Sequence, residues 1–242
     1  MPDKDKQRDK KNNLTNNIIG ITIGIRFARS FRMRDISGNI IDNILYSNKT
    51  PFGTSFFPKV EENSTREKTL YNPETSEYLR INTDDLILGI KIDNDFEKKF
   101  DWLKNNVLNY FRKTLFVEYQ IQNIRRLGII FSHKISKNNK LNDAVSLITN
   151  KTLDNVNDIN ISFSKKFTAV EGLYRKNVND YKNTIYNFHE FKEAIHSDLD
   201  YQYYYEPAIQ DLRECFVDEI IDEAKLFLEN NYYKWLAIYE DK

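Results

Sequence analysis

Alternation of apolar and polar residues begins at Ile18 and is the longest regular pattern in the 242-residue sequence. One parity holds Ile21, Ile23, Ile25, Phe27, Phe31 and Met33, and the other holds Thr22, Arg26, Ser30, Arg32 and Arg34. A period of two is typical of a strand with one face in the core and the other in water. The pattern predicts a long half-buried strand from Ile18 to Arg34, which must pair within a sheet.

Helix and strand patterns follow along the next hundred residues. Ser37 is a predicted N-cap for a short helix whose apolar residues are Ile40, Ile41, Ile44 and Leu45. The polar, proline-containing segment 47–76 predicts a long loop with at most a short strand near Phe56 and Phe57.

The segments Glu77–Asn82 and Asp85–Asp93 flank a short polar turn, which predicts a hairpin. Apolar residues then recur every three or four positions, which predicts a helix from Asp95 to Arg112. Asn123–Ile135 returns to strand character. The predicted order is β-α-β-β-α-β, the ferredoxin-like order, in which helices lie on one face of an antiparallel sheet.

These elements predict an α+β fold with three parts. Residues 1–16 are expected to form a disordered polar tail, residues 17–137 a ferredoxin-like unit, and residues 138–242 a related, degenerate second unit packed against the first. In the second unit we expect a helix at Leu141–Asn150, two pairing strands within 158–191, an aromatic strand at Tyr201–Pro207 and a C-terminal helix.

Charge and cysteine content exclude some classes of protein. Lysine plus arginine and aspartate plus glutamate both number 36, whereas a dedicated nonspecific nucleic-acid binder usually has a basic excess. A local basic face remains open, because a field depends on the arrangement of charges. The single cysteine, Cys215, allows no intrachain disulfide, and the sequence contains neither a signal-peptide pattern nor a membrane span. The predicted location is the cytoplasm.

The segment Arg126–Ile135, RLGIIFSHKI, resembles a strand found in a sporadically distributed family of uncharacterised bacterial proteins. That strand reads roughly Arg-Ile-Gly-Leu-Arg-Tyr-x-Asn-x-Ile, so Ile130 stands where the family has arginine and His133 where it has asparagine. Family members similarly have an N-terminal strand with alternating arginines and an acidic, aromatic C-terminal helix. The resemblance implies no established activity, and it singles out Arg126 and His133 as candidate binding residues.

The arginines near the N-terminus have two interpretations. Arg26, Arg32 and Arg34, on one face of the predicted strand, are candidates for phosphate contacts, or else they form a solvated face paired with carboxylates. Arg29 has the apolar parity, so it needs a buried partner, a bulge or a cleft.

Tyrosines form the second candidate surface. Alternation places Tyr201, Tyr203 and Tyr205 on one face of their strand. Such a row suits a protein interface or base stacking, and the alternative is a core strand.

Catalytic signatures are sparse. No serine-hydrolase, P-loop or dinucleotide motif occurs, the three histidines lack metal-ligand spacing, and Cys215 in a helical pattern is typical of an inert buried thiol. Asp93 and Asp95 leave a metal-dependent nuclease as a third, weaker hypothesis. We therefore predict a noncatalytic binding protein, without cofactor or metal, that recognises a protein partner or forms a homodimer. The alternative is a nucleic-acid-binding component, with RNA as one ligand class.

Overall fold

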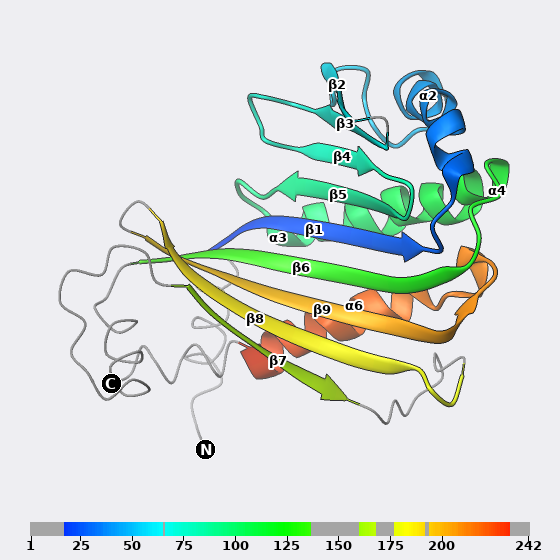
Figure 1. The fold of residues 1–242 in the computed structure, drawn as a ribbon. Coiled ribbons are helices and arrows are strands. Elements are labelled where there is room, and N and C mark those ends of the chain that lie inside the picture. Colours follow the sequence, from blue (N-terminus) through cyan, green and yellow to red (C-terminus); the bar gives the residue numbers. More distant parts are fainter. Residues whose placement is uncertain (1–16, 65, 137–159, 168–176, 192–193, 233–242) are drawn as a thin grey trace.

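A computed structural model describes residues 17–64, 66–136, 160–167, 177–191 and 194–232. Nine strands form one antiparallel sheet in the order β2-β3-β4-β5-β1-β6-β9-β8-β7 (Figure 1). The strands are β1 (Ile18–Phe27), β2 (Lys59–Ser64), β3 (Glu67–Tyr71), β4 (Tyr78–Ile81), β5 (Asp85–Lys91), β6 (Ile124–Ser136), β7 (Asn160–Phe167), β8 (Tyr181–Phe191) and β9 (Ala194–Ile209).

Helices pack against one face of this sheet. The first is α2 (Phe31–Tyr46). The second is a continuous long helix that comprises α3 (Phe96–Trp102), two π-helical segments (Leu103–Leu108 and Phe111–Leu115) and α4 (Phe116–Glu118). The third is α6 (Val217–Phe227), which continues as a π-helical turn to Tyr232. Ion pairs join the long central helix to α6: Lys104 Nζ lies 2.6 Å from Asp222 Oδ2, and Arg112 Nη1 lies 3.2 Å from Asp218 Oδ2. The helices therefore form a single layer.

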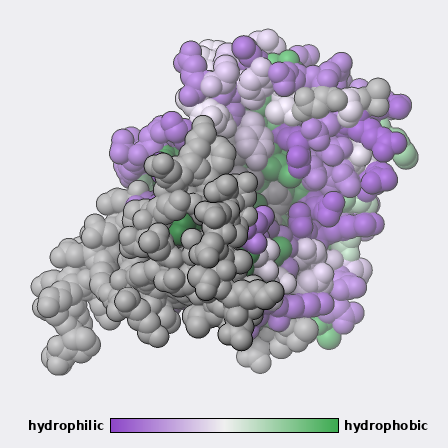
Figure 2. Space-filling model, turned by 60° about the vertical axis from the view of Figure 1, so that its left-hand side comes forward, coloured by the Kyte–Doolittle hydropathy of each residue, from purple (hydrophilic) through white to green (hydrophobic). Residues whose placement is uncertain are grey.

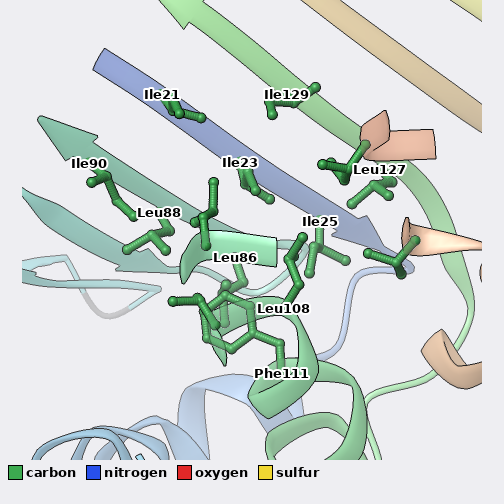
Figure 3. Close-up of a cluster of buried hydrophobic side chains, with 14 of the residues drawn as sticks. Ile21, Ile23, Ile25, Leu86, Leu88, Ile90, Leu108, Phe111, Leu127 and Ile129 are labelled. Atoms are coloured by element: carbon green, nitrogen blue, oxygen red, sulfur yellow. The ribbon is translucent and has the colours of Figure 1, made fainter. Parts of the chain in front are cut away.

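Alternate residues of the central strands supply the core under this layer. Ile21, Ile23 and Ile25 of β1 are buried, as are their neighbours on β5 and β6. Figure 3 shows these side chains directed toward the helix that carries Leu108 and Phe111. The period of two in the sequence therefore did predict which face of β1 enters the core.

The first strand is shorter than the sequence predicts. β1 ends at Phe27 and α2 begins at Phe31, so Arg32 and Arg34 lie on a helix. The buried residues of α2 are Met33, Ser37, Ile40, Ile41 and Ile44, which is a helical stripe. Phe31 was assigned to the core face of a strand and is 61% exposed. Met33 fits both periods, because it precedes Ser37 and Ile40 by four and seven residues, whereas Phe31 fits only the strand period and lies off the helical stripe.

Two other boundaries also differ. The predicted 47–76 loop contains the hairpin of β2 and β3, which the sequence missed because its residues are mostly polar and Leu70 is the buried residue that anchors it. The helix predicted to end near Arg112 continues to Glu118. Its π-helical turns shift the apolar stripe by a residue, so Leu115 and Phe116 remain buried beyond the regular pattern.

Other predictions are confirmed. β4 and β5 form the predicted hairpin, β6 follows the long helix, and β7 pairs with β8. Antiparallel pairing of β6 with β9 joins the two halves of the chain in one sheet. The division at residue 137 into two units stays a prediction, and the predicted helix at Leu141–Asn150 and tail at 1–16 lie outside the described residues.

The described residues on one face of the molecule are mainly polar. Figure 2 shows hydrophilic residues over most of the coloured area, with hydrophobic residues in small patches. Among the described helices, none has the length and apolar character required to cross a membrane.

Candidate anion-binding site

A row of polar side chains crosses five adjacent strands at one end of the sheet. Asp85 of β5 is directly opposite Arg26 of β1, Arg26 is opposite Arg126 of β6, Arg126 is opposite Tyr204 of β9, and Tyr204 is opposite Tyr181 of β8. Directly opposed residues of paired strands project from the same face. The register therefore gathers these five side chains, called here the arginine–tyrosine row, on the face without helices.

A pocket of about 690 Å³ lies at this row. It occupies the end of the sheet where the β1 arrow points in Figure 1. Its charged lining comprises the four arginines Arg26, Arg29, Arg125 and Arg126 and the two carboxylates Asp84 and Glu206. Positive charge is therefore in excess in the pocket, although the whole chain is neutral.

Most guanidinium N–H groups of the pocket have no acceptor among the described residues. Arg26 and Arg29 share Asp84, with Nη2 to Oδ2 distances of 3.8 and 3.9 Å, which are ion pairs too long for hydrogen bonds. Their side chains are 48% and 62% exposed. Arg125 is exposed and has no hydrogen-bond or ion-pair partner in the described parts of the chain. These three arginines therefore keep their donors for a ligand.

Arg126 is held in place by an aromatic ring. Its Nη1 donates to the hydroxyl of Tyr204 at 3.4 Å, and its guanidinium carbon lies 5.7 Å from the centre of that ring. The Tyr204 hydroxyl in turn donates to Gln202 Oε1 at 2.7 Å. Arg126 Nε is buried without a hydrogen-bond partner. Packing thus fixes the direction of this guanidinium, which lowers the entropy lost when it binds a ligand.

The two tyrosine rings of the row are stacked and covered. Tyr181 and Tyr204 are nearly parallel, at 8°, with their centres 4.5 Å apart. Lys166 Nζ of β7 lies 3.8 Å from the centre of the Tyr181 ring. The order across the sheet is therefore ammonium, ring, ring, guanidinium, in which each ring has a ring on one face and a cation on the other.

Two carboxyl groups beneath the arginines have altered proton affinity. Burial raises the pKa of Asp200 to about 6, and this rise is opposed by a hydrogen bond from Gln202 and by the charge of Arg126. Burial also raises the pKa of Asp85, against the attraction of Arg80, whose Nη2 lies 3.9 Å from Asp85 Oδ1. Protonation of Asp200 near neutral pH reduces the negative charge close to Arg126.

A second pocket of about 240 Å³ adjoins the first. Phe27 and Arg29 line both pockets, and Arg32 of α2 lines the second together with Gln120 and Asn123. Arg32 Nη1 lies 3.5 Å from Gln120 Oε1, at the limit of a hydrogen bond. Arg29 therefore stands at the junction of two polar pockets. Because β1 ends at Phe27, the alternation that gave Arg29 the apolar parity does not extend to it, and its side chain is exposed.

The structure brings some of the predicted arginines together and separates others. Arg26, Arg29 and Arg126 line the larger pocket, and Arg32 lines the smaller one. Arg34 lines neither pocket and pairs with its neighbour Asp35 at 3.1 Å. The proposed single strand face carrying Arg26, Arg32 and Arg34 was therefore wrong, because the chain changes from strand to helix between them.

The predicted tyrosine row lies in the core. Tyr201 and Tyr203 are 2% and 0% exposed, which leaves them no surface for a ligand, and the Tyr201 ring packs on Phe227 of α6. Tyr205 is also buried, although it contributes to the pocket lining, and its hydroxyl contacts the Cys215 thiol. The core interpretation of this strand is confirmed, and the burial of Tyr201 and Tyr203 gives no support to the binding role predicted for them.

His133 is also unsuited to surface binding. Its side chain is buried, and Nδ1 lies 3.3 Å from the carbonyl oxygen of Ser197. Burial lowers the pKa of His133 to about 4, so the ring is neutral at physiological pH. The resemblance that singled out this position therefore points to a residue of the sheet interior.

Sequence reasoning missed four members of the site: Arg125, Lys166, Tyr181 and Tyr204. Tyr204 was assigned correctly to the face opposite Tyr201, but no pattern in the sequence pairs it with Arg126. The arginine doublet after Ile124 was the available signal. Strict alternation would send its two members to opposite faces, but the register of β6 shifts between Ile124 and Arg126, and both arginines line the pocket.

The other candidate chemical groups have structural roles. Cys215 lies between the 3-10 turn Leu212–Glu214 and α6, and not within a helix as predicted. Its side chain is buried, and burial raises the pKa of the thiol to about 12, which is typical of an unreactive cysteine. Asp95 caps α3 by accepting from the Lys98 backbone N–H at 3.1 Å, and Asp93 pairs with Lys91 at 2.7 Å. In the described ranges, no three histidine, cysteine or acidic side chains converge as a metal site would require.

Comparison of the sequence with protein-family models and with curated proteins gave no match. The chemistry of the pocket must therefore be read from its own residues. Four guanidinium groups, two of them loosely paired and one without a partner among the described residues, make this pocket a candidate site for an anion. Phosphate and carboxylate are the groups whose geometry matches a guanidinium fork.

Proposed function

We propose that this protein is a noncatalytic, nucleic-acid-binding component whose pocket contacts phosphate groups. One observation carries the proposal: four arginines line one pocket, yet their side chains make one hydrogen bond within the described protein, from Arg126 to Tyr204. Each guanidinium has five N–H donors, and the four guanidinium groups repel one another. The two carboxylates of the pocket lining, Asp84 and Glu206, offset only part of this repulsion, so a bound anion would stabilise the group. Phosphates satisfy both the charge and the fork geometry.

Recognition of a protein partner or self-association is the alternative, and it has weaker support. Large apolar side chains are exposed on the described surface at separate places, including Phe31 and Tyr46 near the two ends of α2. Single exposed apolar residues are normal on soluble domains, whereas interfaces need contiguous patches. The arginine pocket is the more distinctive feature.

A metal-dependent nuclease has less support still. The hypothesis required Asp93 and Asp95 to converge on a cation, but one pairs with Lys91 and the other caps α3. A magnesium site needs two or more oxygen ligands directed to one point.

We also propose the ferredoxin-like interpretation for the first half of the chain. Its support is the strand order: within the sheet, β4, β5, β1 and β6 are consecutive neighbours, and each pair is antiparallel. A β-α-β-β-α-β unit with its fourth strand beside its first has this order.

Retention on a phosphate-bearing cation exchanger tests the nucleic-acid proposal. The protein should be retained at low salt and should elute at modest salt, because binding through phosphates releases counterions. Arg126→Gln should elute earlier than Arg34→Gln, which removes the same charge outside both pockets. Equal elution of the two variants would show that net charge, and not the pocket, causes retention, and would refute the proposal.

A further inference from the structure

We infer that the ligand of the arginine pocket is a phosphodiester chain that is recognised through its backbone and not through its bases. The inference rests on the proposed phosphate-binding function and specifies its ligand class. Three features carry it: the length of the cationic path, the junction of two pockets, and the covered faces of the tyrosine rings.

The cations extend much further than one phosphate. The strands β7, β8, β9, β6 and β1 are consecutive neighbours in the sheet. Lys166 lies on β7 at one end of this set, Arg26 lies on β1 at the other end, and Arg126 lies on β6 between them. Four strand spacings of about 4.8 Å give roughly 19 Å between the outer strands. A nucleic-acid strand carries several phosphates over that length, whereas a mononucleotide reaches only part of it.

The second pocket continues this path. Arg29 lines both pockets, and Arg32 adds a cation in the smaller one. A chain that crosses the arginine–tyrosine row toward α2 therefore meets Arg126, then Arg26 and Arg29, and then Arg32. A ligand confined to one pocket leaves part of this series unused.

The tyrosine rings are unavailable for stacking. Tyr204 has the Arg126 guanidinium on one side and Tyr181 on the other, and Tyr181 has Tyr204 on one side and Lys166 on the other. A base that stacks on either ring must first displace a cation that binds phosphate. The rings instead hold the cations in position, which favours contact with the backbone that all sequences share.

An acidic peptide fits this surface less well. A peptide that adds a strand needs an unpaired sheet edge, but β1, β6, β9 and β8 are each paired on both sides. The pocket also offers few apolar groups to a peptide side chain: Phe27, Pro207 and Ala208. A phosphodiester needs neither, because every repeat presents one charge and two free oxygens to a guanidinium fork.

Four fluorescently labelled probes test the inference by polarisation with the full chain: a 12-residue thymidine oligonucleotide, an abasic deoxyribose-phosphate chain of equal length, a nucleoside monophosphate, and oligoglutamate. The oligonucleotide and the abasic chain should bind with dissociation constants within about threefold of each other, because stacking contributes nothing. Loss of stacking would weaken the abasic chain by roughly 5- to 150-fold for each stacked base. Such a loss overturns the inference.

The other probes separate this inference from the proposed function. The monophosphate should bind at least tenfold more weakly than the two chains, and oligoglutamate should bind more weakly than either. A monophosphate as tight as the chains shows a single-phosphate site, which overturns the inference and leaves phosphate binding intact. Tighter binding of oligoglutamate indicates an acidic protein partner and overturns both. Absence of binding by every probe at low salt also overturns both.

Salt dependence and variants then locate the path. For single strands the logarithm of affinity falls with the logarithm of salt concentration with a slope of about −0.7 for each phosphate contact. Arg126→Gln and Arg29→Gln should each make the slope shallower by about 0.7 and weaken binding severalfold. Arg34→Gln, outside both pockets, should change neither value. Equal slopes for Arg29→Gln and Arg34→Gln would show that the ligand does not contact Arg29, where the two pockets meet.

Discussion

Replacement of Asp84 by asparagine is expected to tighten the binding of phosphate-bearing ligands. The Asp84 carboxylate lies in the pocket lining, 20% exposed, and its Oδ2 is 3.8 Å from Arg26 and 3.9 Å from Arg29. A phosphate that contacts the same two arginines must approach this carboxylate. Asparagine keeps the shape of the side chain and removes the repulsion. The Asp84 backbone carbonyl still accepts from the Phe27 N–H at 3.0 Å, so the turn is retained.

Coulomb's law gives the size of the effect. Two unit charges about 6 Å apart repel by about 0.7 kcal/mol in water and by about 3 kcal/mol at the effective dielectric constant of 20 found near protein surfaces. These limits correspond to roughly 3-fold and 100-fold in the dissociation constant. The side chain is largely buried but faces an open pocket, so we expect about tenfold. The cost in folding stability should stay below about 1 kcal/mol, because both arginines are about half exposed.

The assay is fluorescence polarisation with a labelled oligonucleotide at low salt and again at high salt. Asp35→Asn is the matched control, because Asp35 pairs with an arginine outside both pockets and its removal changes the net charge equally. The gain for Asp84→Asn should shrink at high salt, where charges are screened. Equal affinities for the two variants, or weaker binding by Asp84→Asn, would refute the assignment of this pocket as the anion site.

Three further outcomes concern the folded state. Burial lowers the pKa of His133 to about 4, so below about pH 6.5 the unfolded chain takes up a proton at this residue and the folded protein does not. Between pH 6.5 and 4 the free energy of unfolding of wild type should therefore fall by up to about 3 kcal/mol more than that of His133→Gln. Parallel pH profiles of the two proteins in urea denaturation would contradict this. Cys215 is buried, and burial raises its pKa to about 12. A thiol reagent at pH 8 should therefore react roughly a thousandfold more slowly with the native than with the denatured protein. Rapid labelling of the native protein would contradict the burial. A Cβ added at Gly89 falls 2.2 Å from the Tyr78 ring, whereas at Gly24 the nearest atom is 3.8 Å away. Gly89→Ala should therefore cost about 1–3 kcal/mol of stability and Gly24→Ala less, and equal melting temperatures would show that the ring moves aside freely.

The predictable parts of the fold are those with a clear hydrophobic period. β1 up to Phe27 and the body of the long helix were predicted because their apolar side chains recur with a single period over several turns or pleats. The β2–β3 hairpin was missed because an edge hairpin buries little and needs no such pattern. The strand-to-helix change before Phe31 was missed because Phe31 and Met33 continue the alternation of β1, although Phe31 is exposed on the helix.

The candidate site was predictable in part for a related reason. Arg26 and Arg126 could be singled out as charged residues on strands, but their meeting depends on the register between β1 and β6. The tyrosine that contacts Arg126 is Tyr204, on the strand face opposite the predicted row of Tyr201, Tyr203 and Tyr205. Register is set by the packing of whole strands and leaves no local mark in the sequence.

The amino-acid sequence alone determined the α+β class, the core face of β1, the inert cysteine and the neutral overall charge, because each depends on composition or on side chains close together in the chain. Tertiary structure alone decided that four arginines from β1, β6 and the segment after β1 share a pocket, and that two tyrosines from β8 and β9 form a covered stack beside them. The physical reason is that hydrogen-bonded pairing of strands brings together residues far apart in the chain. Arg26 and Tyr204, 178 positions apart, both lie opposite Arg126 because of the register of β6 with β1 and β9.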